Sequence, residues 1–226
     1  MKNHHAENFD KYHLSRGADR IDSGGYSSRM KFGMIAFFCL LSIVGNLATS
    51  FLASAIHAPI FLDTIFTVAL TFYAGLFPGL IVAVLHNPIR TFIRYVIYGT
   101  DLFYFGSLYA VCGMLIALST WIFSRNKKDF FFNRTVTVLY LLIIVFVSSF
   151  LSCFSASALD TFIRPLLNDS LRFFPTDIFS IPFQKLKFGM FLSYLLPRIP
   201  ITVLDRLICT FLGFGLYRLV ERRISC

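Results

Sequence analysis

Long apolar runs alternate with short polar or proline-containing breaks along this chain. A polar stretch over residues 1–31 comes first, and apolar runs then cover 33–56, 61–74, 78–98, 102–123, 135–159 and 188–219. An α-helix rises about 1.5 Å per residue, so about 20 residues cross a hydrocarbon core about 30 Å thick. All the runs except the second reach this length. The pattern therefore predicts an all-α integral membrane protein built as a bundle of six transmembrane helices.

The breaks within and between these runs carry further predictions. The run over 61–74 is too short to cross a membrane comfortably alone, so we expect it to tilt or to lie inside the bundle. Proline interrupts the third run at Asn87-Pro88 and the sixth run at Pro197 and Pro200. The stretch over 160–189 also contains prolines, and it is predicted to form a loop with a short interfacial segment.

Composition excludes other classes of protein. Hydrophobic residues make up 56% of the chain, charged residues make up 15%, and the mean hydropathy is +0.69. A soluble globular chain has about 25% charged residues, and disordered, coiled-coil and collagen chains need more charge, heptad repeats or glycine. The five cysteines never approach a CxxC spacing. The first four lie inside apolar runs and are predicted to be small buried residues, and neither a disulfide framework nor a zinc site is expected.

The basic residues behind the net charge of +9 lie mostly in the tails and at the ends of the runs. This distribution is typical of membrane topology signals, so the lipid bilayer is a predicted partner and nucleic acid is not. Basic residues concentrate in the N-terminal tail, between the fourth and fifth runs and after the last run: Lys2, Lys11, Arg16, Arg20, Arg29, Lys31, Arg125, Lys127, Lys128, Arg134, Arg218, Arg222 and Arg223. The positive-inside rule then predicts a multi-pass protein of the cell (plasma) membrane with both termini in the cytoplasm. The outer side still receives more arginine than this rule expects.

The predicted organisation has three parts, and none carries the motif of an enzyme. A polar cytoplasmic tail over 1–31 precedes a six-helix membrane domain over 32–219, and a short cytoplasmic tail over 220–226 follows. The sequence lacks GxxxxGK[ST], HExxH and GxSxG. Asp63 and Asp205 lie well inside apolar runs but belong to no catalytic motif. We therefore predict no enzymatic activity, no catalytic residue, no metal site and no cofactor.

Arg90 and Arg94 are the main candidates for binding a solute. They lie one helical turn apart on the outer half of the third run, beside Asn87, and two cations at this spacing repel each other unless an anion neutralises them. A guanidinium fork suits a carboxylate or phosphate group. Alternatively, the two arginines extend to lipid headgroups or pair with Asp101.

Other polar residues within the runs are also open to two interpretations. Asp63 either favours the positive end of a helix dipole or binds a ligand, and Asp160 and Arg164 have the spacing of a local ion pair. Tyr104 belongs to a group of aromatic residues that could stack on a heterocycle or form an interfacial belt. Charged residues in the last run must face protein or water: Arg198 is expected near the solute site, and Asp205 and Arg206 are expected to pair within the bundle or at a partner surface. The candidate substrate-binding residues are Asn87, Arg90, Arg94, Tyr104, Arg164 and Arg198.

Three stretches occur in a characteristic order along the chain. The first is Phe61-Leu62-Asp63-Thr64 leading into Phe72-Tyr73-Ala74-Gly75-Leu76-Phe77-Pro78-Gly79, the second is Tyr109-Ala110-Val111-Cys112-Gly113, and the third is Arg198-Ile199-Pro200 followed by Asp205-Arg206. Together they resemble the substrate-capture subunits, or S components, of energy-coupling factor (ECF) vitamin transporters. The resemblance covers about residues 33–223. It differs from the family pattern at Ala83, where a further glycine often occurs.

The resemblance implies a function and a set of partners. Such a subunit binds a vitamin-like small molecule at its outer face, and a coupling transmembrane subunit and two ABC ATPases supply the energy for uptake. The family usually contacts the coupling subunit through Ala-x-x-x-Ala in the first helix. This chain has Gly45, Thr49 and Ala53 instead, which are also small enough for close helix approach. The alternative function is that of a membrane sensory or scaffold protein without transport activity.

Overall fold

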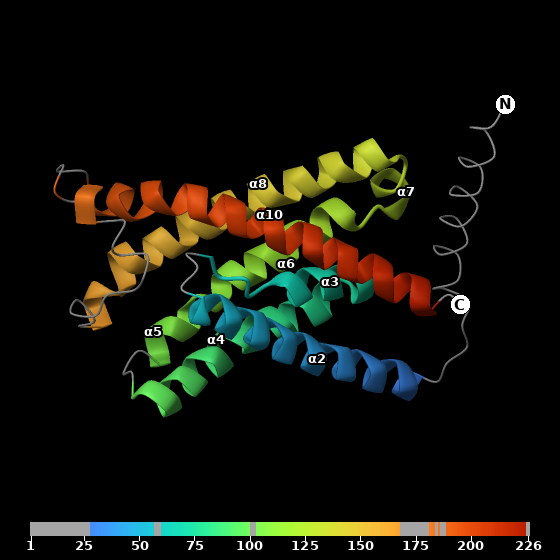
Figure 1. Cartoon of the computed structure of the whole chain (residues 1–226), viewed down its shortest axis with the longest axis horizontal. Coiled ribbons are helices and arrows are strands. Elements are labelled where there is room, and N and C mark those ends of the chain that lie inside the picture. Colours follow the sequence, from blue (N-terminus) through green and yellow to red (C-terminus); the bar gives the residue numbers. More distant parts are fainter. Residues whose placement is uncertain are drawn as a thin grey trace.

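The structure is a computed structural model that describes residues 28–56, 60–99, 103–167, 181–183, 185 and 189–224. The helices in chain order are α2 (Ser28–Ala55), α3 (Ile65–Ala74), α4 (Leu76–Tyr98), α5 (Phe103–Leu108), α6 (Ala110–Ser124), α7 (Lys127–Phe130), α8 (Arg134–Ala158) and α10 (Met190–Ile224). A π-helical turn over Leu159–Ile163 and a short 3-10 helix over Pro165–Leu167 follow α8. The described residues contain no strand (Figure 1). The all-α prediction is confirmed.

Five helical segments are long and apolar enough to cross a membrane. They cover Phe32–Ala55, Leu76–Ile97, Phe105–Ser124, Arg134–Ile163 and Met190–Arg223. Large apolar side chains on their outer faces are exposed, as they would be against lipid, for example Phe37, Phe92 and Phe150. The chain is therefore built as a multi-pass membrane protein.

The predicted count of six spanning helices is not confirmed, because the second run forms a much shorter helix. The 10 residues of α3 rise only about 15 Å, which is half of a hydrocarbon core. Residues 60–64 precede this helix in non-helical conformation and lie beside α2, where the Thr49 hydroxyl donates a hydrogen bond of 2.5 Å to the Leu62 carbonyl. Non-helical backbone at membrane depth needs such partners inside the protein.

Glycine separates α3 from α4. Gly75 has φ of +88°, a conformation that favours glycine, and α4 begins at the next residue.

Proline does not interrupt the later helices. The interruptions predicted at Pro88, Pro197 and Pro200 are wrong, because α4 and α10 continue through these residues. The fourth run is instead divided at Tyr109, between α5 and α6. α10 continues to Ile224, beyond the predicted end of the membrane domain at residue 219.

The helices form a bundle in which α10 packs against α8 and α3, while α6 packs against α4 and α8 (Figure 1). The first turn of α2, α7 and the last turn of α10 lie at one end of this bundle, on the right in Figure 1. The end of α4, α5 and the beginning of α10 lie at the opposite end. We refer to the first as the α7 end and to the second as the α5 end.

An aromatic cluster closes the core near the α7 end. Phe130 is fully buried among Phe72, Phe214, Phe131 and Tyr140, with ring centroids 5.0–5.8 Å away. Lys127 donates a hydrogen bond of 3.1 Å to the Phe72 carbonyl, and its ammonium lies 5.2 Å from the ring centroid of Tyr217. Burial lowers the pKa of Lys127, and the nearby Glu221 carboxylate partly offsets this effect. The short helix α7 is thereby anchored to α3, α8 and α10.

Candidate functional site

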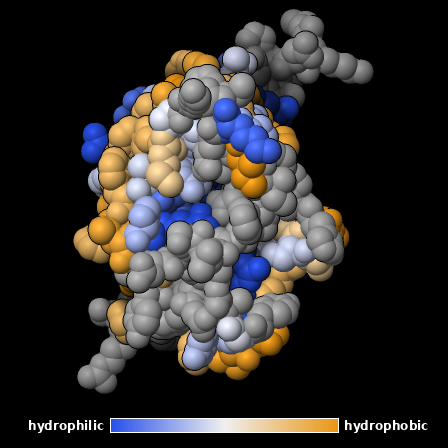
Figure 2. Space-filling view, turned by 90° about the vertical axis from the view of Figure 1, so that its left-hand side faces the viewer, coloured by the Kyte–Doolittle hydropathy of each residue, from blue (hydrophilic) through white to orange (hydrophobic). Residues whose placement is uncertain are grey.

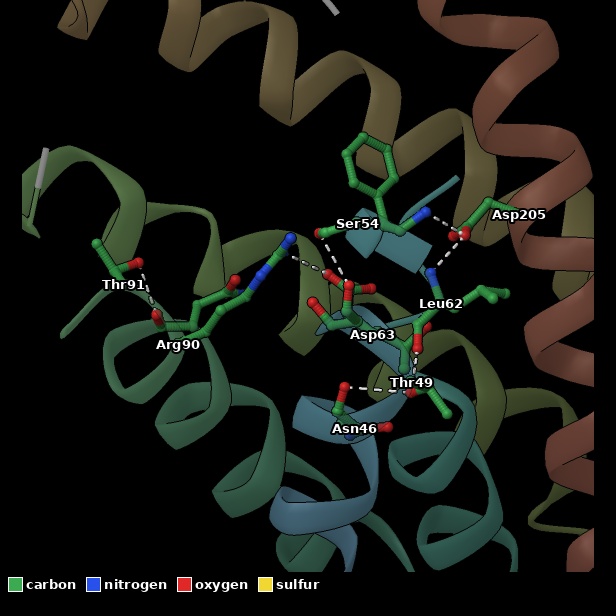
Figure 3. Close-up of polar contacts among 12 residues, drawn as sticks. Asn46, Thr49, Ser54, Leu62, Asp63, Arg90, Thr91 and Asp205 are labelled. Atoms are coloured by element: carbon green, nitrogen blue, oxygen red, sulfur yellow. Dashed lines mark hydrogen bonds and ion pairs between the residues drawn. The ribbon is translucent and has the colours of Figure 1, made fainter. Parts of the chain in front are cut away.

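A buried ion network lies where residues 60–64 meet α4 and α10. The Asp63 carboxylate lies 3.7 Å from the Arg90 guanidinium and 3.6 Å from that of Arg206. Arg206 also lies 3.0 Å from the Asp205 carboxylate and donates a hydrogen bond to the Thr64 hydroxyl. We call Asp63, Arg90, Asp205 and Arg206 the Asp63 cluster, and Figure 3 shows the first three of these residues. Two carboxylates and two guanidinium groups balance in charge.

The Asp205 carboxylate also binds the backbone of the preceding segment. Its Oδ1 accepts hydrogen bonds of 2.8 Å from the Phe61 amide and 2.9 Å from the Leu62 amide (Figure 3). Leu62 has φ of +46°, which is a left-handed conformation that a non-glycine residue adopts at a cost of about 1–3 kcal/mol. Asp205 and Thr49 therefore hold residues 60–64 in a strained conformation, because they satisfy the backbone groups on either side of the strain.

Several polar atoms around the Asp63 cluster are buried without hydrogen-bond partners among the described residues. They are both ring nitrogens of His86, Asp63 Oδ1 and Arg206 Nε. His86 is 2% exposed and lies within electrostatic range of Asp63 and Arg90. Leaving such a group unsatisfied costs about 1–3 kcal/mol, so an arrangement of this kind in a native protein requires an explanation.

A second set of buried polar residues, the Asp160 cluster, joins the π-helical turn after α8, Tyr109 before α6, and α10. The Tyr109 hydroxyl donates a hydrogen bond of 2.6 Å to Asp160, and Arg198 forms an ion pair with the same carboxylate. The Arg198 guanidinium lies 5.9 Å from the centroid of the Tyr109 ring. Asp160 belongs to the π-helical turn after α8, and such turns occur frequently at functional sites.

The two clusters are neighbours within the bundle. Cys112 on α6 lies within electrostatic range of Arg198 in one cluster and of Arg206 in the other. Within the Asp63 cluster the exposed fraction of the side chains falls with depth, from 18% for Arg90 and 13% for Asp63 to 6% for Arg206 and 0% for Asp205. Figure 2 shows the α5 end of the molecule, where hydrophilic atoms are visible in a hollow of the surface. Arg90 and Asp63 are thus the accessible members of their cluster.

The structure brings only some of the predicted solute-binding residues together. Arg90 belongs to the Asp63 cluster and Arg198 to the Asp160 cluster, whereas Arg94 is exposed one turn beyond Arg90. Arg164 is buried, with 6% exposure, and Asn87 accepts a hydrogen bond of 2.8 Å from the Thr91 hydroxyl at its backbone carbonyl. The side chain of Tyr104 and the whole of Asp101 lie outside the residues that the structure describes.

Several members of the clusters were not among the candidate substrate-binding residues, and neither was the neighbouring His86. These members are Asp63, Tyr109, Asp160, Asp205 and Arg206. Asp63 does not occupy the N-cap of α3, which is Thr64, and it instead separates two arginines. Asp160 forms an ion pair with Arg198 from α10, a partner that the spacing along the chain did not suggest. The signal available in the sequence was an ionisable residue within an apolar run, which by itself indicates a functional or paired group.

The stripe of Gly45, Thr49 and Ala53 packs against other residues of this chain, and its role as a partner interface stays a prediction. A Cβ atom at Gly45 would lie 2.7 Å from the Phe66 ring, Ala53 is 1% exposed, and Thr49 binds the Leu62 carbonyl. The small residues permit close packing of α2 against α3 and residues 60–64. Ala53 is buried in this packing, whereas Gly45 and Thr49 stay half-buried.

Neither a metal site nor a similar known protein indicates what the two clusters do. Within the described part of the chain, no three His, Cys, Asp or Glu side chains lie close enough together to hold a metal ion. Comparison with known proteins finds no matching family model, no similar curated protein and no similar solved structure.

Proposed function

We propose that this chain is the substrate-capture subunit of an ECF-type ABC importer. It binds a vitamin-like small molecule at the outer face of the cell membrane and carries out no catalysis itself. A coupling transmembrane subunit and two ABC ATPases act with it and supply the energy. This assignment is consistent with the absence of a phosphate-binding loop in the sequence.

The observation that carries the proposal is the pair of charged clusters inside a membrane bundle. A charged side chain near the centre of a bilayer costs about 2.5–3.5 kcal/mol on insertion scales, so such residues usually mark pathways or binding sites. Here residues 60–64, α4, α10 and the π-helical turn after α8 contribute charges to adjoining clusters, and Arg90 and Asp63 are the most exposed members of the Asp63 cluster. The two ring nitrogens of His86, which have no hydrogen-bond partner among the described residues, could bond a polar group of the solute next to Arg90.

The proposed function requires the α5 end to face outward and both termini to be cytoplasmic. Lys127, Lys128 and Arg134 lie at or beside α7, at the end where α10 also terminates with Arg222 and Arg223. This concentration of basic residues supports a cytoplasmic α7 end by the positive-inside rule.

Cysteine labelling of intact cells tests this orientation. In a chain carrying Cys226→Ser, we expect Lys128→Cys to react with a membrane-impermeant maleimide only after permeabilisation, because residue 128 is exposed beside α7. Leu166→Cys is the matched position at the opposite end, 78% exposed as leucine, and should react in intact cells. The reverse labelling pattern would show that the orientation is inverted.

Solute binding is tested on the full chain purified from cells grown in rich medium. We expect mass spectrometry to find a co-purifying small molecule. We also expect Arg90→Gln to weaken its binding by about 30-fold or more, because truncating one partner of a buried charge pair costs about 2–5 kcal/mol. Arg94→Gln tests the second predicted arginine, and Arg125→Gln is the matched control, since Arg125 is exposed at the far end of α6. If the Arg90→Gln variant bound the solute with wild-type affinity, the Asp63 cluster would not be part of the solute-binding site.

Co-purification with other subunits distinguishes transport from a sensory or scaffold role. Co-expression with candidate coupling and ATPase subunits should yield a stable complex with the chain. A chain that carries no solute and joins no ATPase complex would contradict the proposal.

A further inference from the structure

We propose that Arg90 and Arg206 form the binding site for a carboxylate group of the solute, and that Asp63 occupies this site as a built-in carboxylate until the solute displaces it. The inference rests on the proposed function. It narrows the class of solute to molecules with a singly charged anionic group, which binds between Arg90 and Arg206.

Asp63 is held loosely by the two arginines. Its carboxylate oxygens lie 3.7 Å and 3.6 Å from the guanidinium nitrogens, whereas a charge-assisted hydrogen bond measures about 2.7–2.9 Å. Asp63 Oδ1 and Arg206 Nε have no hydrogen-bond partner within the described residues although both atoms are buried. In contrast, Asp205 lies 3.0 Å from Arg206 and also accepts two backbone hydrogen bonds. A free carboxylate with better geometry would therefore gain contacts that Asp63 does not make.

The arginines and the aspartate belong to different kinds of element. Arg90 lies on α4 and Arg206 on α10, two long helices whose positions the bundle determines. Asp63 lies in the non-helical residues 60–64, directly after Leu62 with its strained φ of +46°. Movement of this segment would release backbone strain and withdraw the carboxylate, while the two guanidinium groups would stay in place.

Charge and access define the class of ligand. Without Asp63, the cluster of Arg90, Asp205 and Arg206 carries a net charge of one positive unit, which a single carboxylate neutralises and a neutral or cationic group does not. Arg90 is the more exposed arginine and Arg206 the deeper one, so a carboxylate that enters past Arg90 reaches Arg206. His86 lies beside Arg90 and offers a nitrogen donor and a nitrogen acceptor to an adjoining polar group of the same solute.

Chemical rescue with formate tests this assignment on the full chain in an uncharged detergent. We expect Asp63→Ala to lower the Tm by about 10 °C, because two buried arginines lose a counter-charge. Sodium formate should restore at least half of this loss with saturating concentration dependence, and sodium chloride at equal ionic strength should not. Asp129→Ala is the matched control, since Asp129 is an exposed carboxylate, and its Tm should not respond specifically to formate.

A second variant keeps the test decisive if Asp63→Ala does not fold. Asp63→Asn retains the shape of the side chain, and formate should raise its Tm more than chloride does, whereas additional Arg90→Gln should abolish the difference. Equal effects of formate and chloride on the Asp63 variants would overturn the proposal. Rescue by phosphatidylglycerol but not by formate would also overturn it, because the bound anion would then be a lipid headgroup. Neither result bears on the wild-type solute measured by mass spectrometry, so the proposed function is tested separately.

Discussion

Replacing Arg206 with methionine is expected to lower the free energy of unfolding by about 3–5 kcal/mol, because it leaves buried charge without a partner. The Arg206 side chain is 6% exposed and approaches both Asp205, which is 0% exposed, and Asp63. Methionine fills a similar volume but supplies neither charge nor hydrogen-bond donors. The Thr64 hydroxyl also loses its bond to Arg206. Denaturation of the purified chain in mixed micelles measures the loss.

Arg218→Met on the same helix is the matched control for this experiment. Arg218 pairs with Glu221 one turn away, but its side chain is 34% exposed, and ion pairs of this kind contribute about 0–1 kcal/mol. Adding Asp205→Asn to Arg206→Met should cost less than the sum of the two single substitutions, since the two groups interact directly. A loss for Arg206→Met no larger than for Arg218→Met would show that the Asp63 cluster does not stabilise the bundle.

Replacing Phe130 with alanine is expected to destabilise the chain by about 3–5 kcal/mol, because it opens a cavity in a packed aromatic cluster. Phe130 is 0% exposed and contacts the rings of Phe72 and Phe214 at centroid distances of 5.6 Å and 5.8 Å. These rings belong to α3 and α10, so the cavity would loosen the contact between α3 and the helix that carries Asp205 and Arg206. The same unfolding measurement in mixed micelles quantifies the effect.

Phe132→Ala, two residues along the chain, isolates the effect of burial from that of removing a phenyl ring. Phe132 is 80% exposed, and substitutions at exposed positions usually change stability by less than about 0.5 kcal/mol. If both variants lost similar stability, the aromatic cluster would not be a principal contact at the α7 end.

The membrane-spanning helices could be predicted from the sequence because their main determinant is local. A run of about 20 apolar residues can bury its backbone polar groups only as a helix, whatever it packs against. For this reason the boundaries of α4 and α8 lie close to those expected from the runs 78–98 and 135–159. Pro88 does not end its helix, since a transmembrane helix tolerates the loss of one hydrogen bond when neighbouring groups compensate.

The short helix α3 required information that the run over 61–74 does not contain. Its apolar composition is compatible with a helix over the whole run, yet residues 60–64 are not helical and α3 begins only at Ile65. They do so where Asp205 binds the amides of Phe61 and Leu62 from a position more than 140 residues later in the chain. The pattern of apolar residues within the run cannot predict this contact with Asp205.

The sequence by itself determined that the chain is helical, that it is a membrane protein, and that its intramembrane charges need partners. All three follow from the cost of placing backbone or charge in hydrocarbon, which depends on residue type and run length alone. Only the tertiary structure decided which charges pair. Spacing along the helices brought Asp160 together with Arg164 and Arg90 with Arg94. It gave no sign that Asp160 pairs with Arg198 from α10 or that Arg90 pairs with Asp63 from residues 60–64. Ion pairing depends on distance in space, and in a bundle the crossing of helices distant in sequence determines that distance.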